Sequence, residues 1–133
     1  LVQADQERHL RKVKANINNI IDYEYYMMKD AEVIVFAYGS TARAARVAVD
    51  NARKLGIKVG MMRFRVIWPL PETEILKLCS KAKAIIIPEM NMGQLSDVIE
   101  RYAADRTKIL RINHVGGVPI HPTHICDVIK EAI

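Results

Sequence analysis

Three short stretches of the sequence place polar or ionisable side chains beside small residues, each directly after an apolar run. The ends of parallel strands form the edge at which open α/β sheets bind ligands. The sequence therefore predicts that these stretches share one sheet edge, where they could contact an anion or a neighbouring subunit. The side chains and glycine concerned are Gly39, Ser40, Thr41, Glu89, Asn91 and His114.

The first stretch precedes a helix that we expect to begin near Ala42. A helix N-terminus presents free N–H groups and the positive end of its dipole to an anion, and Arg43 lies in that first turn. However, one glycine and two hydroxyls are also what a tight turn capped by Ser40 or Thr41 requires. No Gly-x-Gly-x-x-Gly or Gly-x-x-x-x-Gly-Lys-Ser/Thr motif occurs. We favour the turn and cap, with contact to a ligand or a subunit as the alternative.

The second stretch combines one acid with two methionines. Met90 and Met92 flank Asn91, which indicates a soft, adaptable contact surface. Glu89 is either a functional carboxylate or the cap of the following turn, and a single acid does not decide between them. We favour contact with another subunit for this loop.

The histidines predict neither catalysis nor metal binding. His114 lacks an evident nucleophile or acid partner for base catalysis. His121 is expected at the cap of the last helix. His121, His124 and Cys126 lack the further ligands of a zinc site. We therefore assign no catalytic residue and no metal ligand.

The two cysteines are predicted to be buried thiols. Cys79 and Cys126 are far apart, and neither belongs to a Cys-x-x-Cys pair. Buried free thiols are typical of proteins in the reducing cytoplasm, which is the expected compartment. An iron–sulfur cluster would need about four clustered thiolates, which this sequence does not contain.

Alternating strands and helices are expected to position these residues. Apolar runs at 32–38, 58–64, 84–88 and 108–113 are nearly continuous, as in parallel strands covered on both faces. Helical patterns occupy 42–55, 71–80, 94–105 and 122–133. Residues 23–28 either extend a first helix or form an edge strand. The alternation predicts an open α/β domain.

Composition and charge restrict the choice of partner. Half of the 133 residues are hydrophobic and 26% are charged, which excludes a disordered chain, and no apolar run approaches a membrane span. The net charge of +5 arises between residues 31 and 70, where seven basic residues face two acidic ones. Because aromatic residues are not interleaved with these charges, we expect no nucleic-acid binding. We expect instead an acidic partner or a bound anion.

The N-terminal segment and the helix expected over residues 42–55 give further expectations. The first segment has apolar residues at helical spacing, so it should pack on its own subunit or on a neighbouring one. The first residues carry no signal-peptide pattern. The sequence begins with Leu1 rather than with a methionine, so we expect a piece of a longer polypeptide. In the helix after residue 41, an alanine-rich stripe should face the sheet. Asp50 should pair with Arg46 and Lys54 on the outer face.

Four blocks together resemble one enzyme family. Residues 37–45, 65–71, 88–94 and 113–119 are similar, in order, to the C-terminal part of the α subunit of 2-oxoacid:ferredoxin oxidoreductases, with the 2-oxoglutarate type the most similar branch. The resemblance implies a three-layer α/β/α fold like the transketolase C-terminal domain, with a mostly parallel, mixed sheet of about five strands. It also implies that residues 1–30 are a helical connector and residues 31–133 are the α/β domain.

The resemblance implies a reaction carried out elsewhere in the parent enzyme. The family decarboxylates a 2-oxoacid on thiamine diphosphate with Mg²⁺, forms an acyl-CoA and passes electrons through iron–sulfur clusters to ferredoxin. No Gly-Asp-Gly diphosphate motif occurs here, so no cofactor is expected in this chain. Its expected role is to organise the β subunit and the other domains, with a homodimer as a further alternative. The alternatives are an independent CoA- or phosphate-binding module using Ser40, Thr41 and Arg43, or the equivalent domain of a transketolase or 2-oxoacid dehydrogenase β subunit.

Overall fold

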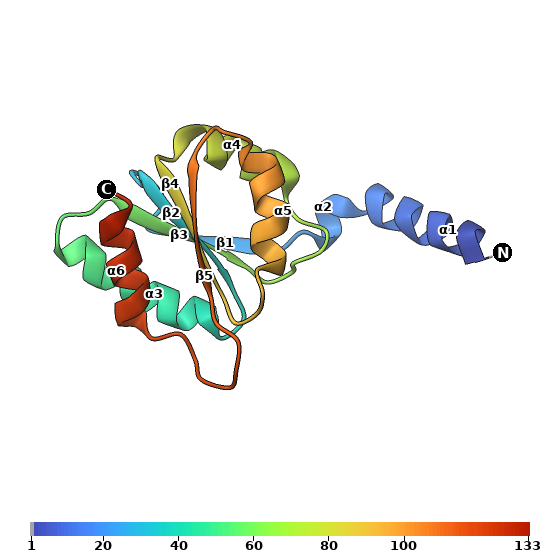
Figure 1. The fold of residues 1–133 in the computed structure, drawn as a ribbon. Helices are drawn as coiled ribbons and strands as arrows, with labels where there is room; N and C mark the ends of the chain where they lie inside the picture. The colour runs from blue at the N-terminus through green and yellow to red at the C-terminus, as the bar shows by residue number, and fades with distance from the viewer. Residues whose placement is uncertain (1) are drawn as a thin grey trace.

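A single mixed sheet forms the centre of the molecule, shown in a computed structural model that describes residues 2–133 (Figure 1). Its five strands have the order β1-β3-β2-β4-β5. Strands β2 to β5 are parallel, whereas β1 pairs antiparallel with β3 and places Tyr23 opposite Phe64. The strands are β1 (Tyr23–Tyr26), β2 (Val33–Tyr38), β3 (Val59–Phe64), β4 (Ala84–Glu89) and β5 (Lys108–Asn113). Of the two alternatives for residues 23–28, the structure shows the edge strand.

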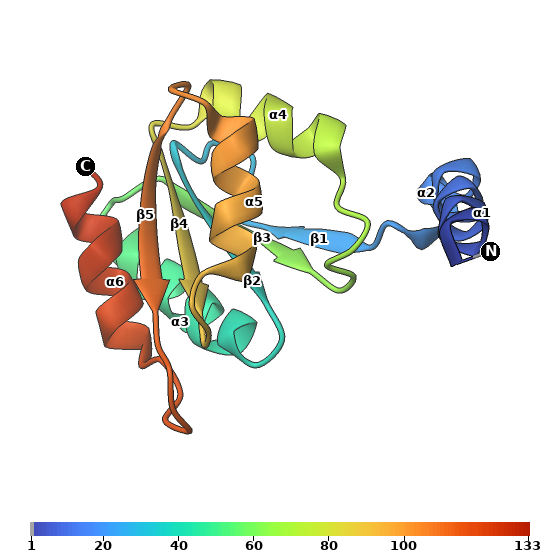
Figure 2. The same cartoon turned by 45° about the vertical axis from the view of Figure 1, so that its right-hand side comes forward.

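Helices cover both faces of the sheet. Helices α3 (Thr41–Lys54) and α6 (Pro122–Glu131) lie on one face, and α4 (Glu72–Lys81) and α5 (Gln94–Ala103) lie on the other (Figure 2). Side chains of a strand alternate between faces. Val35 accordingly packs with the α3 and α6 side, and Phe36 packs with the α4 and α5 side. The predicted three-layer α/β/α architecture is confirmed.

Helix α3 approaches the sheet through small side chains. Its inner face buries Ala42, Ala45, Ala48, Val49 and Ala52, as the alanine-rich stripe predicts. Because these side chains are small, little material separates the helix backbone from the sheet, and α3 packs closely on the sheet.

The outer face of α3 is paired with other elements. The Tyr26 hydroxyl donates to Asp50, and the Arg46 guanidinium lies 4.4 Å from the centre of the Tyr26 ring. The predicted pairing of Asp50 with Arg46 and Lys54 is therefore wrong. Strand β1 passes beside α3 and supplies a partner that spacing along one helix cannot reveal.

The N-terminal helices extend away from this body. Helix α1 (Val2–Ala15) and the short α2 (Ile17–Ile20) project from the sheet in both views (Figures 1 and 2). No side chain of α1 is buried, and Leu10 is 48% exposed. The expectation that this helix packs on its own subunit is not met within residues 2–133. None of the helices in this range combines the length and apolar character of a membrane span.

Candidate functional site

The predicted site lies at the edge of the sheet where strands β2 and β4 end side by side. From β2 the chain continues to β3 on one side, whereas β4 leads to β5 on the other. Open α/β sheets bind ligands at such a reversal of strand order. The loops after Tyr38 and Glu89 therefore occupy the position in which a ligand would be expected.

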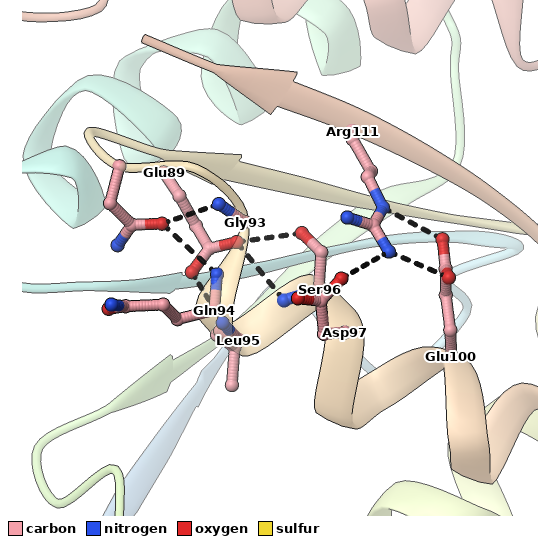
Figure 3. Close-up of polar contacts among 9 residues, drawn as sticks. Glu89, Gly93, Gln94, Leu95, Ser96, Asp97, Glu100 and Arg111 are labelled. Atoms are coloured by element: carbon pink, nitrogen blue, oxygen red, sulfur yellow. Dashed lines mark hydrogen bonds and ion pairs between the residues drawn. The ribbon is translucent and has the colours of Figure 1, made fainter. Parts of the chain in front are cut away.

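Glu89 fills the anion-binding position of this edge with its own carboxylate. It is 1% exposed and accepts hydrogen bonds from the N–H groups of Leu95 and Ser96, at 2.7 and 3.0 Å (Figure 3). The Ser96 hydroxyl donates to it at 2.7 Å. These N–H groups belong to the first turn of α5, where a negative charge is favourable. Of the two roles predicted for Glu89, the structure shows the cap.

Asn91 and Tyr38 complete the same network. Asn91 Oδ1 accepts from the N–H groups of Gly93 and Gln94, at 2.7 and 3.2 Å. Its Nδ2 donates to the Tyr38 hydroxyl at 2.6 Å, and that hydroxyl lies 3.2 Å from Glu89 Oε1. Burial, and secondarily the Glu89 charge, raise the pKa of Tyr38, which therefore stays protonated. The polar groups of this edge thus bond to one another.

A second charged group supports the same loop from β5. Arg111 pairs with Asp97 at 2.8 Å and with Glu100 at 2.7 Å, both on α5 (Figure 3). Its hydrogen bond to Glu100 lowers the pKa of that carboxyl. Gly93 has φ +98°, and a Cβ atom there would lie 2.9 Å from Arg111 Nη1. Arg111 was not predicted to belong to this site, because its only signal in the sequence is a basic residue within an apolar strand.

The remaining predicted residues of this edge occupy separate positions. Gly39 is exposed with φ +60°, and Ser40 is at the N-cap of α3 but makes no side-chain cap bond. Thr41 is buried rather than presented to a ligand. The half-buried His114 donates its backbone N–H to the Glu89 carbonyl at 2.9 Å. Ser40 therefore does not form the hydroxyl cap predicted for α3, although the predicted turn before the helix is present.

The structure also shows the positions of Met90, Met92 and His121. Met92 is 76% exposed, whereas Met90 is half-buried against the core, so only Met92 is available for the predicted contact. His121 caps α6, as predicted, because its Nδ1 accepts from the Thr123 N–H at 3.1 Å.

Arg43 does not join the sheet edge. It lines a hollow together with Tyr26, Arg46 and Arg63, which belong to β1, α3 and β3. The arginine therefore faces residues outside the loops that follow β2, β4 and β5.

The donor groups of the chain do not fit an iron–sulfur cluster or a metal ion. Within residues 2–133, no cluster of three or more His, Cys, Asp and Glu side chains could hold a metal. Cys79 and Cys126 are buried and unpaired on separate helices, α4 and α6. Burial raises the pKa of the Cys79 thiol and so disfavours the thiolate that ligates iron.

Comparison with known proteins assigns the fold to a family. The profile of pyruvate:ferredoxin oxidoreductase core domain II matches residues 31–125. The chain belongs to this core domain II family. Subunit KorA of 2-oxoglutarate synthase from Methanocaldococcus jannaschii is 34% identical over 110 residues, covering 83% of this chain and 29% of KorA. Ketoisovalerate oxidoreductase subunit VorB from Methanothermobacter marburgensis is 38% identical over 120 residues, covering 90% of this chain and 34% of VorB.

Solved structures share the fold of this chain. A 2-oxoglutarate:ferredoxin oxidoreductase from Magnetococcus marinus, solved with 2-oxoglutarate, coenzyme A and succinyl-CoA bound, superposes with a TM-score of 0.80 at 27% identity. The match covers 97% of this chain and 23% of that one. A split-gene transketolase, an inactive beta4 tetramer, gives a TM-score of 0.68 at 13% identity over 84% and 41% of the two chains, which shows a shared fold alone.

These findings confirm the resemblance to a domain of 2-oxoacid:ferredoxin oxidoreductases and the transketolase-like fold. The relatives named above are subunits of oxidoreductases, and the chain spans about a third of their length, between 29% and 34%.

Proposed function

We propose that this chain is a non-catalytic C-terminal domain of the α subunit of a 2-oxoacid:ferredoxin oxidoreductase. The parent enzyme would oxidatively decarboxylate a 2-oxoacid to an acyl-CoA and reduce ferredoxin. Support for 2-oxoglutarate as the substrate comes from the KorA subunits among the relatives and from the Magnetococcus marinus structure. The division into a connector, residues 1–30, and an α/β domain, residues 31–133, is part of the proposal; the connector contributes strand β1 to the sheet.

The observation that carries a subunit-organising role is the exposed helix α1. A hollow of about 550 Å³ lies between this helix and Trp68, which is 63% exposed. Leu10 and Val13 line the hollow, at the spacing of one helix face. Apolar residues in such a position are typical of surfaces that another protein covers.

The cofactors and partners of the parent enzyme follow from this assignment. Mg²⁺ and the iron–sulfur clusters would bind elsewhere in the complex, because the residues described above do not fit a metal or a cluster. Thiamine diphosphate would also bind elsewhere, since the sequence has no Gly-Asp-Gly motif, and CoA is assigned to the parent enzyme. The partners would be the β subunit and the other domains, with ferredoxin docking on the complex and a homodimer as a further option. The two free, buried cysteines support a cytoplasmic location.

Activity of the isolated chain tests its non-catalytic nature. The purified chain is mixed with thiamine diphosphate, Mg²⁺, 2-oxoglutarate, CoA and ferredoxin, and ferredoxin reduction is followed. We expect no turnover, while the complete oxidoreductase assayed in parallel is active. Any turnover by the chain above the protein-free blank contradicts the proposal.

A variant in α1 tests the organising role in the complete oxidoreductase. We expect Leu10→Asp with Val13→Asp to weaken assembly in size-exclusion chromatography, because both charges would enter the apolar contact. Ala4→Asp with Ala15→Asp adds the same charge to exposed positions of the same helix and should leave assembly unchanged. Equal assembly of both double variants would show that α1 does not form part of the interface.

A further inference from the structure

A second polar feature lies on the α3 side of the sheet, away from the Glu89 network. It is a hollow of about 260 Å³ bounded by strands β1 and β3 and by the first half of α3. Three arginines line it, with one acidic residue among them. The charged and aromatic residues that matter are Arg43, Arg46, Arg63, Glu24 and Tyr26.

The positive charge of this hollow exceeds the acid available to neutralise it. Glu24 is shared, because it pairs with Arg63 at 3.3 Å and with Arg65, just outside the hollow, at 2.7 Å. The neighbouring Asp50, which accepts from the Tyr26 hydroxyl, is a second acid, so three arginines still face two carboxylates. Among the residues described by the structure, Arg43 and Arg46 form no ion pair with a carboxylate. The basic surplus between residues 31 and 70 is therefore partly concentrated here.

Two of the guanidinium groups are held in place before any ligand arrives. Arg46 lies over the Tyr26 ring at 4.4 Å, and Arg63 is held by Glu24. A guanidinium stacked on an aromatic face keeps its N–H edge free to donate. Ordering such groups in advance reduces the entropy lost on binding.

Arg43 departs from the local rules of helix stability. It lies in the first turn of α3, which contains no acidic residue, and it is exposed. A cation at this end opposes the helix dipole. Residues that break a local rule without a structural gain tend to mark functional positions.

From these contacts we propose that the arginine hollow binds one small oxyanion, the phosphate or carboxylate group of a small molecule. Guanidinium groups bind both anions through paired N–H donors. Typical sites for drug-sized ligands measure about 300–1,000 Å³. The smaller volume here suits a single oxyanion rather than a whole nucleotide. This site is independent of the proposed oxidoreductase role, since it depends only on this chain.

The test uses the chain labelled with ¹⁵N-arginine and titrated at constant ionic strength. Inorganic phosphate and succinate are the two probes, with chloride as the balancing ion. We expect saturable shifts of the Arg43 and Arg46 Nε signals with at least one probe. The probe that saturates distinguishes a phosphate ligand from a carboxylate ligand.

Paired variants separate a specific site from general charge attraction. R43Q with R46Q should weaken binding at least tenfold. R101Q with R106Q removes two exposed charges from elsewhere and should change affinity less than twofold. Urea unfolding confirms that each variant is folded before titration. Absence of saturable binding to either probe, or equal weakening by both double variants, overturns the proposal.

Discussion

The Glu89 network and the arginine hollow each place charge at the start of a helix, with opposite results. At α5, a buried carboxylate faces the positive end of the helix and accepts its N–H groups. At α3, the exposed cation Arg43 faces the same kind of end and forms no ion pair among the described residues. The Glu89 carboxylate, which is hydrogen-bonded within the fold, stabilises it. The Arg43 guanidinium, which opposes the helix dipole and has no ion-pair partner among the described residues, remains available to bind another molecule.

Removing the Glu89 carboxylate should have the largest effect. Glu89→Ala leaves the Leu95 and Ser96 N–H groups buried without their acceptor. We expect a loss of about 2–4 kcal/mol in the free energy of unfolding, measured by urea denaturation. The exposed Glu131→Ala is the control and should cost less than about 0.5 kcal/mol. A loss below 1 kcal/mol would mean that water replaces the carboxylate, and this edge would then resemble a ligand site.

A side chain at Gly93 should have the next largest effect. Gly93→Ala forces a left-handed residue to accept a Cβ 2.9 Å from Arg111 Nη1 and 3.1 Å from Asn113 Nδ2. We expect a cost of about 1–3 kcal/mol in unfolding free energy.

Gly117, which has neither a left-handed backbone nor a close contact, supplies a control for this substitution. A Cβ at Gly117 meets no atom within 4 Å, so Gly117→Ala should change stability by less than about 0.5 kcal/mol. Equal losses for the two variants would show that the Gly93 loop is not tightly constrained.

The Arg111 ion pairs should contribute less and should depend on pH. Arg111→Gln is expected to cost about 0.5–1 kcal/mol at pH 7, because Asp97 and Glu100 are 61% and 46% exposed and solvent screens the pairs. Arg111 lowers the pKa of Glu100 in the folded state. The stabilisation is therefore present above the unfolded pKa and is lost as pH falls through the lowered folded value.

Urea midpoints across a pH series measure this difference. The wild-type chain and the Arg111→Gln variant should differ at pH 7 and converge as pH falls through the lowered folded pKa of Glu100. Arg101→Gln, on the exposed surface of α5, should give no such convergence. A difference that persists at low pH would assign the effect of Arg111 to packing rather than to charge.

The smallest effect, with the opposite sign, is expected at Arg43. Arg43→Gln removes a cation from the positive end of α3 and should stabilise the chain by about 0.3 kcal/mol. The midpoint of thermal unfolding, compared with that of Lys54→Gln at the other end of the same helix, measures it. Lys54 lies in the last turn, so its loss should be neutral or slightly destabilising. Destabilisation by Arg43→Gln would show that Arg43 has an internal role.

Elements were predictable because their signals are local. The apolar run of β4 and the small inner stripe of α3 specify a buried strand and a closely packed helix from neighbouring residues alone. The two possible roles of Glu89 could not be separated in this way, since Leu95 and Ser96 become its partners only after the loop turns back. Arg111 was missed for the same reason, because it meets Asp97 and Glu100 across a strand and a helix.

The sequence by itself determined the α/β class, the family and the basic surplus between residues 31 and 70. Tertiary structure alone decided which charges are neutralised and which remain. Arg53 finds Asp30 at 2.7 Å, while Arg43 and Arg46 meet at a hollow built from β1, α3 and β3. Pairing energy depends on distance and burial rather than on position along the chain. A surplus visible in composition therefore becomes a candidate site only once the fold places the charges together.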